Sequence, residues 1–167
     1  AELIVHRSCK WSHVTSLSYH IRSDLMCTSY GATALFEYSE TLMQHVQEPL
    51  NRRVLAAANA VGTSGTPGRG RFCVVYLRID EPRGVVDEAT FQADGCGPTI
   101  ASASLLTEMI TGLAVTDCWQ MTADDLEAAL GGLPGHRKHC AVMAITALYN
   151  ALQGWSPSDF PSREGVN

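Results

Sequence analysis

The sequence predicts an α+β fold, in which a small antiparallel sheet is covered on one face by helices. Two runs rich in β-branched and aromatic residues, 72–79 and 85–93, are separated by the turn 81–84, which is typical of an antiparallel hairpin. Apolar residues recur at helical spacing before and after this hairpin. With 46% hydrophobic residues among 167, the chain can build one packed core. The apolar face of so small a sheet must then be buried against the helices.

The sequence before the hairpin predicts two helices and a loop. Residues 38–47 carry apolar side chains at helical spacing and are followed by Pro49, so we expect a helix that ends there. The Ala-rich run 54–60 predicts a second, short helix. The glycines of 62–70 predict a loop that leads into the first strand.

Four helices are expected after the hairpin. Thr122, with Asp125 three residues later, predicts a capping box at the start of the third. The run 131–135 contains three glycines and a proline and should separate the third helix from the last. The four expected helices span 97–111, 115–121, 123–130 and 139–153.

The two ends of the chain differ in composition from this central domain, which we place at 38–153. Residues 1–37 are rich in Ser, Thr, His and aromatic residues, and they show a period-two pattern as well as His at every seventh position. These two patterns favour a strand and a helix respectively, so we assign neither. We expect an N-terminal arm that either forms a homo-oligomer with another chain or is disordered, and a flexible tail at 154–167.

Composition restricts the classes of function. The net charge is −5, so no overall basic field favours nucleic acid. The longest apolar run near the N-terminus, 25–36, is shorter than the roughly 20 residues that a transmembrane helix needs. The six cysteines form no CxxC pair, and no signal peptide is recognisable, which together indicate a reducing cytoplasm.

Two cysteine-containing segments carry the chemistry. Cys96 stands between Gly95 and Gly97 at the start of an expected helix, whose N-terminus favours thiolate over thiol. His139 and Cys140 stand side by side at the start of the last helix. Two thiolates and an imidazole would form a site for a soft metal if the fold brings them together. The alternative is that both cysteines pack in the interior.

These segments resemble those of the U-type iron–sulfur cluster scaffolds, IscU and the N-terminal domain of NifU, in order, spacing and local chemistry. The resemblance implies the fold of that family and a metal site at Cys96, His139 and Cys140, in which the two cysteines ligate a cluster or accept sulfur. It runs from Tyr38 to about Gln153. The matching segments are Tyr38-Ser39-Glu40, Glu48-Pro49-Leu50-Asn51, Gly65-Thr66-Pro67-Gly68-Arg69-Gly70, the Cys96 corner with Ile100-Ala101-Ser102, Leu106-Thr107-Glu108, Leu133-Pro134 and Lys138-His139-Cys140.

The chain departs from the family pattern at the site itself. Where the family has a third cysteine and, two residues later, an aspartate, this chain has Arg69 and Arg71. A guanidinium cannot bind a cation, but near Cys96 it would lower the thiol pKa and hold anions. Cys73 is a candidate extra ligand, although it lies about 13 Å further along an extended strand, and a core position is the alternative. The family's chaperone-recognition segment is kept only in part, at 133–138.

Two functions are consistent with this pattern, and neither makes the chain an enzyme. In the first, the resemblance implies an iron–sulfur cluster assembly scaffold or carrier. It would receive sulfur from a cysteine desulfurase, hold a transient [2Fe–2S] cluster or zinc, and pass the cluster to apo Fe–S proteins. In the second, a degenerate scaffold without a cofactor serves one large metalloenzyme complex, such as a hydrogenase, as a structural or oligomerising subunit or as a dedicated maturation adaptor.

Overall fold

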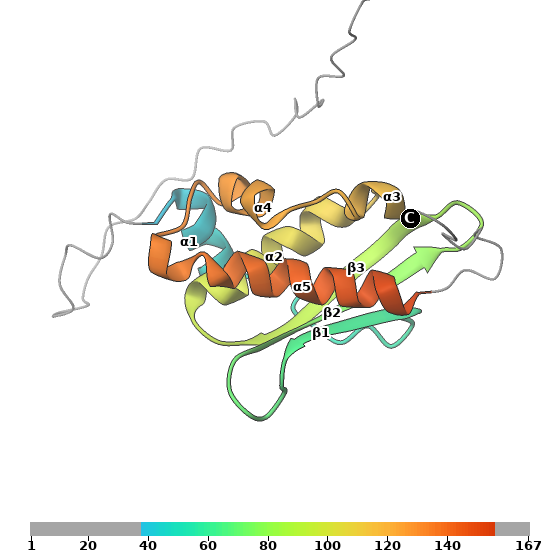
Figure 1. The fold of residues 1–167 in the computed structure, drawn as a ribbon, viewed down its shortest axis with the longest axis horizontal. Coiled ribbons are helices and arrows are strands. Elements are labelled where there is room, and N and C mark those ends of the chain that lie inside the picture. The colour runs from blue at the N-terminus through green and yellow to red at the C-terminus, as the bar shows by residue number, and fades with distance from the viewer. Residues whose placement is uncertain (1–37, 156–167) are drawn as a thin grey trace, which may run out of the picture. The chain divides into compact units, whose positions relative to one another are not determined.

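A three-stranded antiparallel sheet forms one layer of the domain (Figure 1). The computed structural model describes residues 38–155. The strands are β1 (Ala60–Gly65), β2 (Phe72–Asp80) and β3 (Val85–Asp94), in the order β1-β2-β3. The predicted hairpin is confirmed: β2 and β3 pair antiparallel, with Phe72 opposite Asp94 and Asp80 opposite Val85.

The helices lie together on one face of this sheet, as the sequence predicts (Figure 1). The long helix α5 (His139–Gly154) packs across β1 and β2, while α2 (Gly97–Ile110) packs on β3 and beside α5. Helix α1 (Glu40–Gln47) packs against α2, and α4 (Ala123–Ala129) packs against α5. The short α3 (Val115–Cys118) and the 3-10 turn η1 (Gly135–Arg137) complete the described elements.

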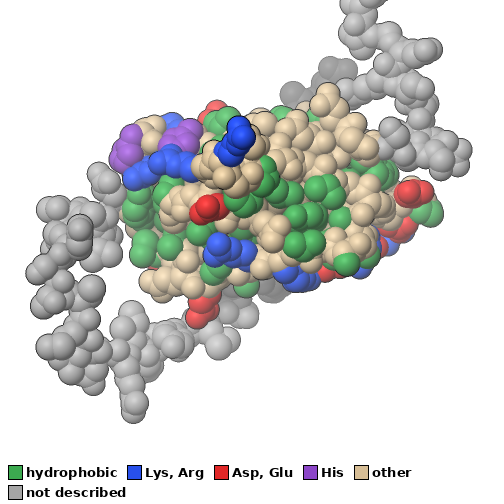
Figure 2. Space-filling model, turned by 90° about the horizontal axis from the view of Figure 1, so that it is seen from below, with side chains coloured by type: hydrophobic (Ala, Val, Ile, Leu, Met, Phe, Trp, Pro, Cys, Tyr) green, Lys and Arg blue, Asp and Glu red, His purple; other side chains and the backbone are tan. Residues whose placement is uncertain are grey.

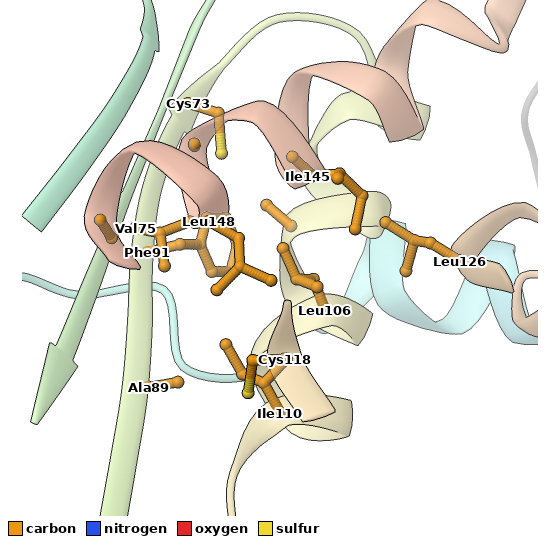
Figure 3. Close-up of a cluster of buried hydrophobic side chains, with 14 of the residues drawn as sticks. Cys73, Val75, Ala89, Phe91, Leu106, Ile110, Cys118, Leu126, Ile145 and Leu148 are labelled. Carbon is orange, nitrogen blue, oxygen red and sulfur yellow. The ribbon is translucent and has the colours of Figure 1, made fainter. Parts of the chain in front are cut away.

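The core lies between the sheet and the two long helices. Alternate residues of β2, including Val75 and Leu77, point towards the helices and are fully buried, because successive side chains of a strand face opposite ways. They belong to one buried cluster with Leu106 of α2 and Leu148 of α5. Figure 3 shows Val75 of this cluster beside Leu148 and Phe91 of β3. Each fully buried aliphatic or aromatic side chain of this kind stabilises the fold by about 1.5–3 kcal/mol.

The largest error of the sequence prediction lies before the hairpin. Residues 54–59 form turns and irregular structure instead of a helix, and the expected loop begins with strand β1. A short helix does not form in isolation, and here tertiary contacts give the backbone another path. Asn59 fixes this path: its Nδ2 donates to Ile79 O (2.7 Å) and its Oδ1 accepts from Ile79 N (2.8 Å).

Most predicted elements after the hairpin are confirmed. Helices α2, α4 and α5 lie within a residue or two of the expected bounds, and Thr122 and Asp125 form the expected capping box. Helix α3 ends at Cys118, three residues earlier than expected. The arm 1–37 and the residues after 155 lie outside the described part of the chain, so the expected arm and tail stay predictions. Between residues 38 and 155, no helix has the length and apolar character that crossing a bilayer requires.

Candidate metal–thiol site

One end of the hairpin gathers the predicted site residues. Because Phe72 pairs with Asp94, the β1–β2 loop and the β3–α2 corner are neighbours at that end, where α5 also begins (Figure 1). Cys96 is the residue that caps α2, with extended backbone angles (φ −77°, ψ 165°). A Cβ at Gly95 would lie 3.1 Å from Thr99 Oγ1, so glycine there leaves room for Thr99 beside Cys96.

The structure places the sulfur atoms of Cys96 and Cys140 in direct contact. Their Sγ atoms are 3.5 Å apart, and Thr99 Oγ1 lies 3.3 Å from Cys96 Sγ and donates to Cys140 Sγ at 3.4 Å. Cys96 is half-buried and Cys140 is fully buried. Residues 44 positions apart in the chain therefore form one dithiol pocket, which has one side open to solvent.

The two thiols of the dithiol pocket differ in acidity. Burial opposes ionisation of Cys96, but the hydrogen bonds from Thr99 and Cys140 and the charge of Arg137 outweigh it and hold its pKa below the ordinary value. For Cys140, burial and the neighbouring Cys96 raise the pKa, although Thr99 and Arg137 act in the opposite direction. Cys96 is therefore the more acidic thiol of the pair, and Cys140 is the less acidic one.

His139 lies at the edge of the dithiol pocket, where an arginine contacts it. Its Nε2 is 3.6 Å from Cys140 Sγ and 3.0 Å from Arg71 Nη1. A guanidinium can only donate hydrogen bonds, so Nε2 is the acceptor and the ring of a neutral His139 carries its proton on Nδ1. Arg71 thus occupies the lone pair through which this imidazole would ligate a metal.

Comparison with known proteins identifies the family. The family model described as the NifU-like N terminal domain matches residues 37–160. The chain belongs to this family. It is 33% identical over 120 residues to the iron–sulfur cluster assembly scaffold protein IscU of Aquifex aeolicus, covering 72% of this chain and 76% of that protein. It is 35% identical over 115 residues to an IscU scaffold protein of Archaeoglobus fulgidus, covering 69% of this chain and 74% of that protein.

Longer relatives and solved structures agree with this assignment. The nitrogen fixation protein NifU of Azotobacter chroococcum is 35% identical over 121 residues, but the match covers 72% of this chain and only 39% of that protein. A crystal structure from Fervidobacterium islandicum, described as a scaffold of the SUF system, superposes with a TM-score of 0.57 at 19% identity, over 73% of this chain and 99% of that one. At that identity the superposition supports the U-type fold alone.

Within this NifU-like domain, the two arginines at the departing positions have different surroundings. Arg71 reaches the dithiol pocket through His139. Arg69 is exposed on the β1–β2 loop, where its amide donates to Thr66 O at 3.0 Å. The cation that lowers the pKa of Cys96 belongs to neither of them but to Arg137.

The structure places Cys73, the candidate extra ligand, in the core of the NifU-like domain. Its side chain is fully buried on the helix-facing side of β2 (Figure 3). Burial raises its pKa to about 12, so it remains a thiol. Cys118 is buried in the same core, and burial and Asp117 raise its pKa to about 11. We therefore assign both residues to packing, which for Cys73 is the alternative that the sequence left open.

Two residues of the dithiol pocket were missed by the sequence reasoning. Thr99 carried a detectable signal, because it lies three residues after Cys96 on the first turn of α2, within reach of the helix start. Arg137 lies in the partly kept segment 133–138 and carried no signal of its own. Its Nε is buried and has no hydrogen-bond partner among the described residues.

The donors of this NifU-like domain fall short of a complete metal site. Within residues 38–155, no group of three or more His, Cys, Asp or Glu side chains is arranged to hold a metal ion. Two sulfur atoms converge, and the nearby imidazole is hydrogen-bonded to Arg71. Zinc and iron–sulfur clusters usually take four ligands, so a metal bound here needs ligands from elsewhere or a movement of Arg71.

Proposed function

We propose that this chain is an iron–sulfur cluster scaffold or carrier, which holds a transient [2Fe–2S] cluster as cargo and passes it to apo Fe–S proteins. The observation that carries the proposal is the 3.5 Å contact between Cys96 Sγ and Cys140 Sγ, on the fold of a family whose relatives are named as cluster assembly scaffolds. Thiolates are the ligands that such clusters require. In this role the chain binds and releases cargo and does not turn over a substrate.

Each site residue has a defined part in this proposal. Cys96 and Cys140 are the thiolate ligands or sulfur acceptors, and Cys96, with the lower pKa, reacts first. His139 is the adjoining ligand, available once Arg71 moves from Nε2. The half-buried position of Cys96 leaves the pocket accessible to a cysteine desulfurase that donates sulfur and to the proteins that receive the cluster. The described cysteines are all free.

The test is to measure iron and acid-labile sulfide per chain in protein purified without oxygen. We expect about two of each, the content of a [2Fe–2S] cluster, and expect them to be lost in Cys96→Ser and in Cys140→Ser. Cys118→Ala is the control, because it removes a thiol that packs in the core beside Ile110 (Figure 3), and it should retain both. Iron that survives Cys96→Ser, or no iron in any preparation, would contradict the proposal.

A second function is favoured by the hydrogen bond between Arg71 and His139. A scaffold in which an arginine occupies the imidazole lone pair can act through its shape, as a structural subunit or maturation adaptor of a large metalloenzyme complex. In that case the chain would co-purify with a large partner at fixed stoichiometry and without metal. The Cys96→Ser variant would then bind the partner as well as the wild type does, which separates the two functions.

A further inference from the structure

Guanidinium groups from two separate segments act on the dithiol pocket. Arg71, at the end of the β1–β2 loop, donates to His139 Nε2 at 3.0 Å, and His139 Nε2 lies 3.6 Å from Cys140 Sγ. Arg137, in η1, places its charge near both thiols, and its Nε is buried without a partner among the described residues. Figure 2 shows His side chains at one end of the described domain with Lys or Arg side chains beside them, and further Lys and Arg side chains elsewhere on the same face.

We propose that the dithiol pocket takes up a preassembled, negatively charged, thiol-ligated iron–sulfur cluster in preference to a free divalent metal ion, and that Arg71 is the residue that makes this distinction. The inference rests on the proposed function and specifies the form in which the cargo arrives. It also identifies the source of the missing ligands, since such a cluster brings its own thiolates.

A free metal cation meets two obstacles in this pocket. Arginine keeps its positive charge at every accessible pH, so Arg71 and Arg137 repel an arriving Fe²⁺ or Zn²⁺. The cation must also displace Arg71 before it can bind His139 Nε2, because one lone pair cannot serve both. Without that nitrogen, only Cys96 and Cys140 remain as donors from this chain.

A thiol-ligated cluster meets the opposite conditions. Its sulfides and thiolates carry more negative charge than its ferric ions carry positive charge, so both guanidinium groups attract it. The cluster sulfides can accept hydrogen bonds from Arg71, which lies at the edge of the pocket on His139.

The uptake step is a ligand exchange without redox change. Each Fe–S bond to Cys96 or Cys140 forms as one Fe–S bond to an external thiolate breaks, and both iron ions keep their oxidation state. An incoming cysteine that is a thiol passes its proton to the external thiolate that it displaces, and an incoming thiolate releases the external ligand as a thiolate. No oxidant or reductant enters the balance, and the displaced external ligands are the only products besides the loaded chain.

The experiment compares two cargoes on matched variants. One probe is a [2Fe–2S] cluster ligated by glutathione, with uptake followed by visible circular dichroism and by iron per chain after desalting. The other probe is Zn²⁺ alone, with affinity measured against a chromogenic chelator. Arg71→Gln removes the charge at the pocket, and Arg83→Gln removes the same charge at the far end of the hairpin, where Arg83 is exposed beside Asp80.

We expect the ratio of cluster uptake to zinc affinity to fall at least about tenfold in Arg71→Gln and to stay within about twofold of wild type in Arg83→Gln. In the wild type, added KCl should weaken cluster uptake and strengthen zinc binding, because screening reduces both the attraction and the repulsion. This second measurement needs no variant.

Two results would overturn the inference in distinguishable ways. In the first, the wild type takes up the cluster, but the ratio of cluster uptake to zinc affinity is the same in Arg71→Gln and Arg83→Gln, or cluster uptake and zinc binding respond alike to salt. This result would refute the selectivity and leave the scaffold function standing. A wild type that takes up no cluster from glutathione, and gains none when a cysteine desulfurase and iron are supplied, would refute the proposed function and the inference with it.

Discussion

Gly62 allows α5 to approach the sheet closely, and replacing it by alanine should separate the two layers. A Cβ at this position would lie 2.7 Å from Ala151 Cα and closer still to Ala147 O and Ala151 N. These are backbone atoms, so no side-chain rotation can relieve the overlap. The glycine therefore positions the helix whose first two residues are His139 and Cys140.

The size of the effect follows from this geometry. Carbon atoms in ordinary contact are about 3.7 Å apart, so α5 must retreat from β1 by about 1 Å at Ala151. A gap of this size forfeits up to about half of the dispersion energy of each affected contact. The fully buried Ala147, Leu148 and Ala151 all lie on this part of α5. We expect Gly62→Ala to cost about 3 kcal/mol of unfolding free energy, the upper end for an overpacked core.

Urea unfolding of the metal-free protein, followed by far-UV circular dichroism, measures this cost. At a typical denaturant slope, 3 kcal/mol corresponds to a midpoint roughly 1–2 M lower. Gly154→Ala is the control, because a Cβ there meets no atom within 4 Å and the residue ends α5. If the Gly62→Ala midpoint equals that of Gly154→Ala with an unchanged slope, α5 does not lie as close to β1 as described.

Three further predictions address the pH dependence of stability and the roles of individual cysteines. Burial lowers the pKa of His45, although the charge of Glu108 acts in the opposite direction, so the unfolded chain takes up this proton at a higher pH than the folded chain. The unfolding free energy should therefore fall as the pH is lowered from about 7 to about 5, and it should fall less in His45→Gln. Thr99→Val removes a hydrogen bond that opposes the effect of burial on Cys96, so the pKa of Cys96, measured by its alkylation rate against pH, should rise, whereas Thr99→Ser should keep it low. Cys73→Ala should lower stability while leaving the iron content of the folded protein unchanged, and a loss of iron from folded protein would restore this residue as a ligand.

The elements that were predicted correctly are those with a strong local signal. The hairpin follows from its two β-rich runs and the turn between them, and α4 from the capping box at Thr122. Strand β1 has no such signal, because its sequence of small and polar residues lacks alternation and contains two glycines. Its formation depends on pairing with β2 and on the contact of Gly62 with α5. These are tertiary contacts, which a local sequence pattern does not reveal.

The same distinction applies to the candidate site. The glycines around Cys96 and the adjacent His139 and Cys140 are local signals, and they led to residues that do meet in space. The family resemblance supplied the expectation that they meet, since no spacing rule joins residues 44 positions apart. The roles of Thr99 and Arg137 depend on the three-dimensional arrangement, and Cys73 could be assigned to the core only once its burial was known.

The departures from the family pattern bear on whether this site has a changed function or has lost its function. One departure puts Arg71 in the β1–β2 loop and the other puts Arg137 in the altered segment before α5, 66 positions away in the chain. Arg137 acts on both thiols through its charge, and Arg71 contacts His139, whose Nε2 lies 3.6 Å from Cys140 Sγ. Cations from two separate segments beside an intact dithiol give this end of the domain the electrostatics of an anion-binding site. Their convergence favours a pocket adapted to an anionic cargo over a degenerate scaffold that is kept only for its shape.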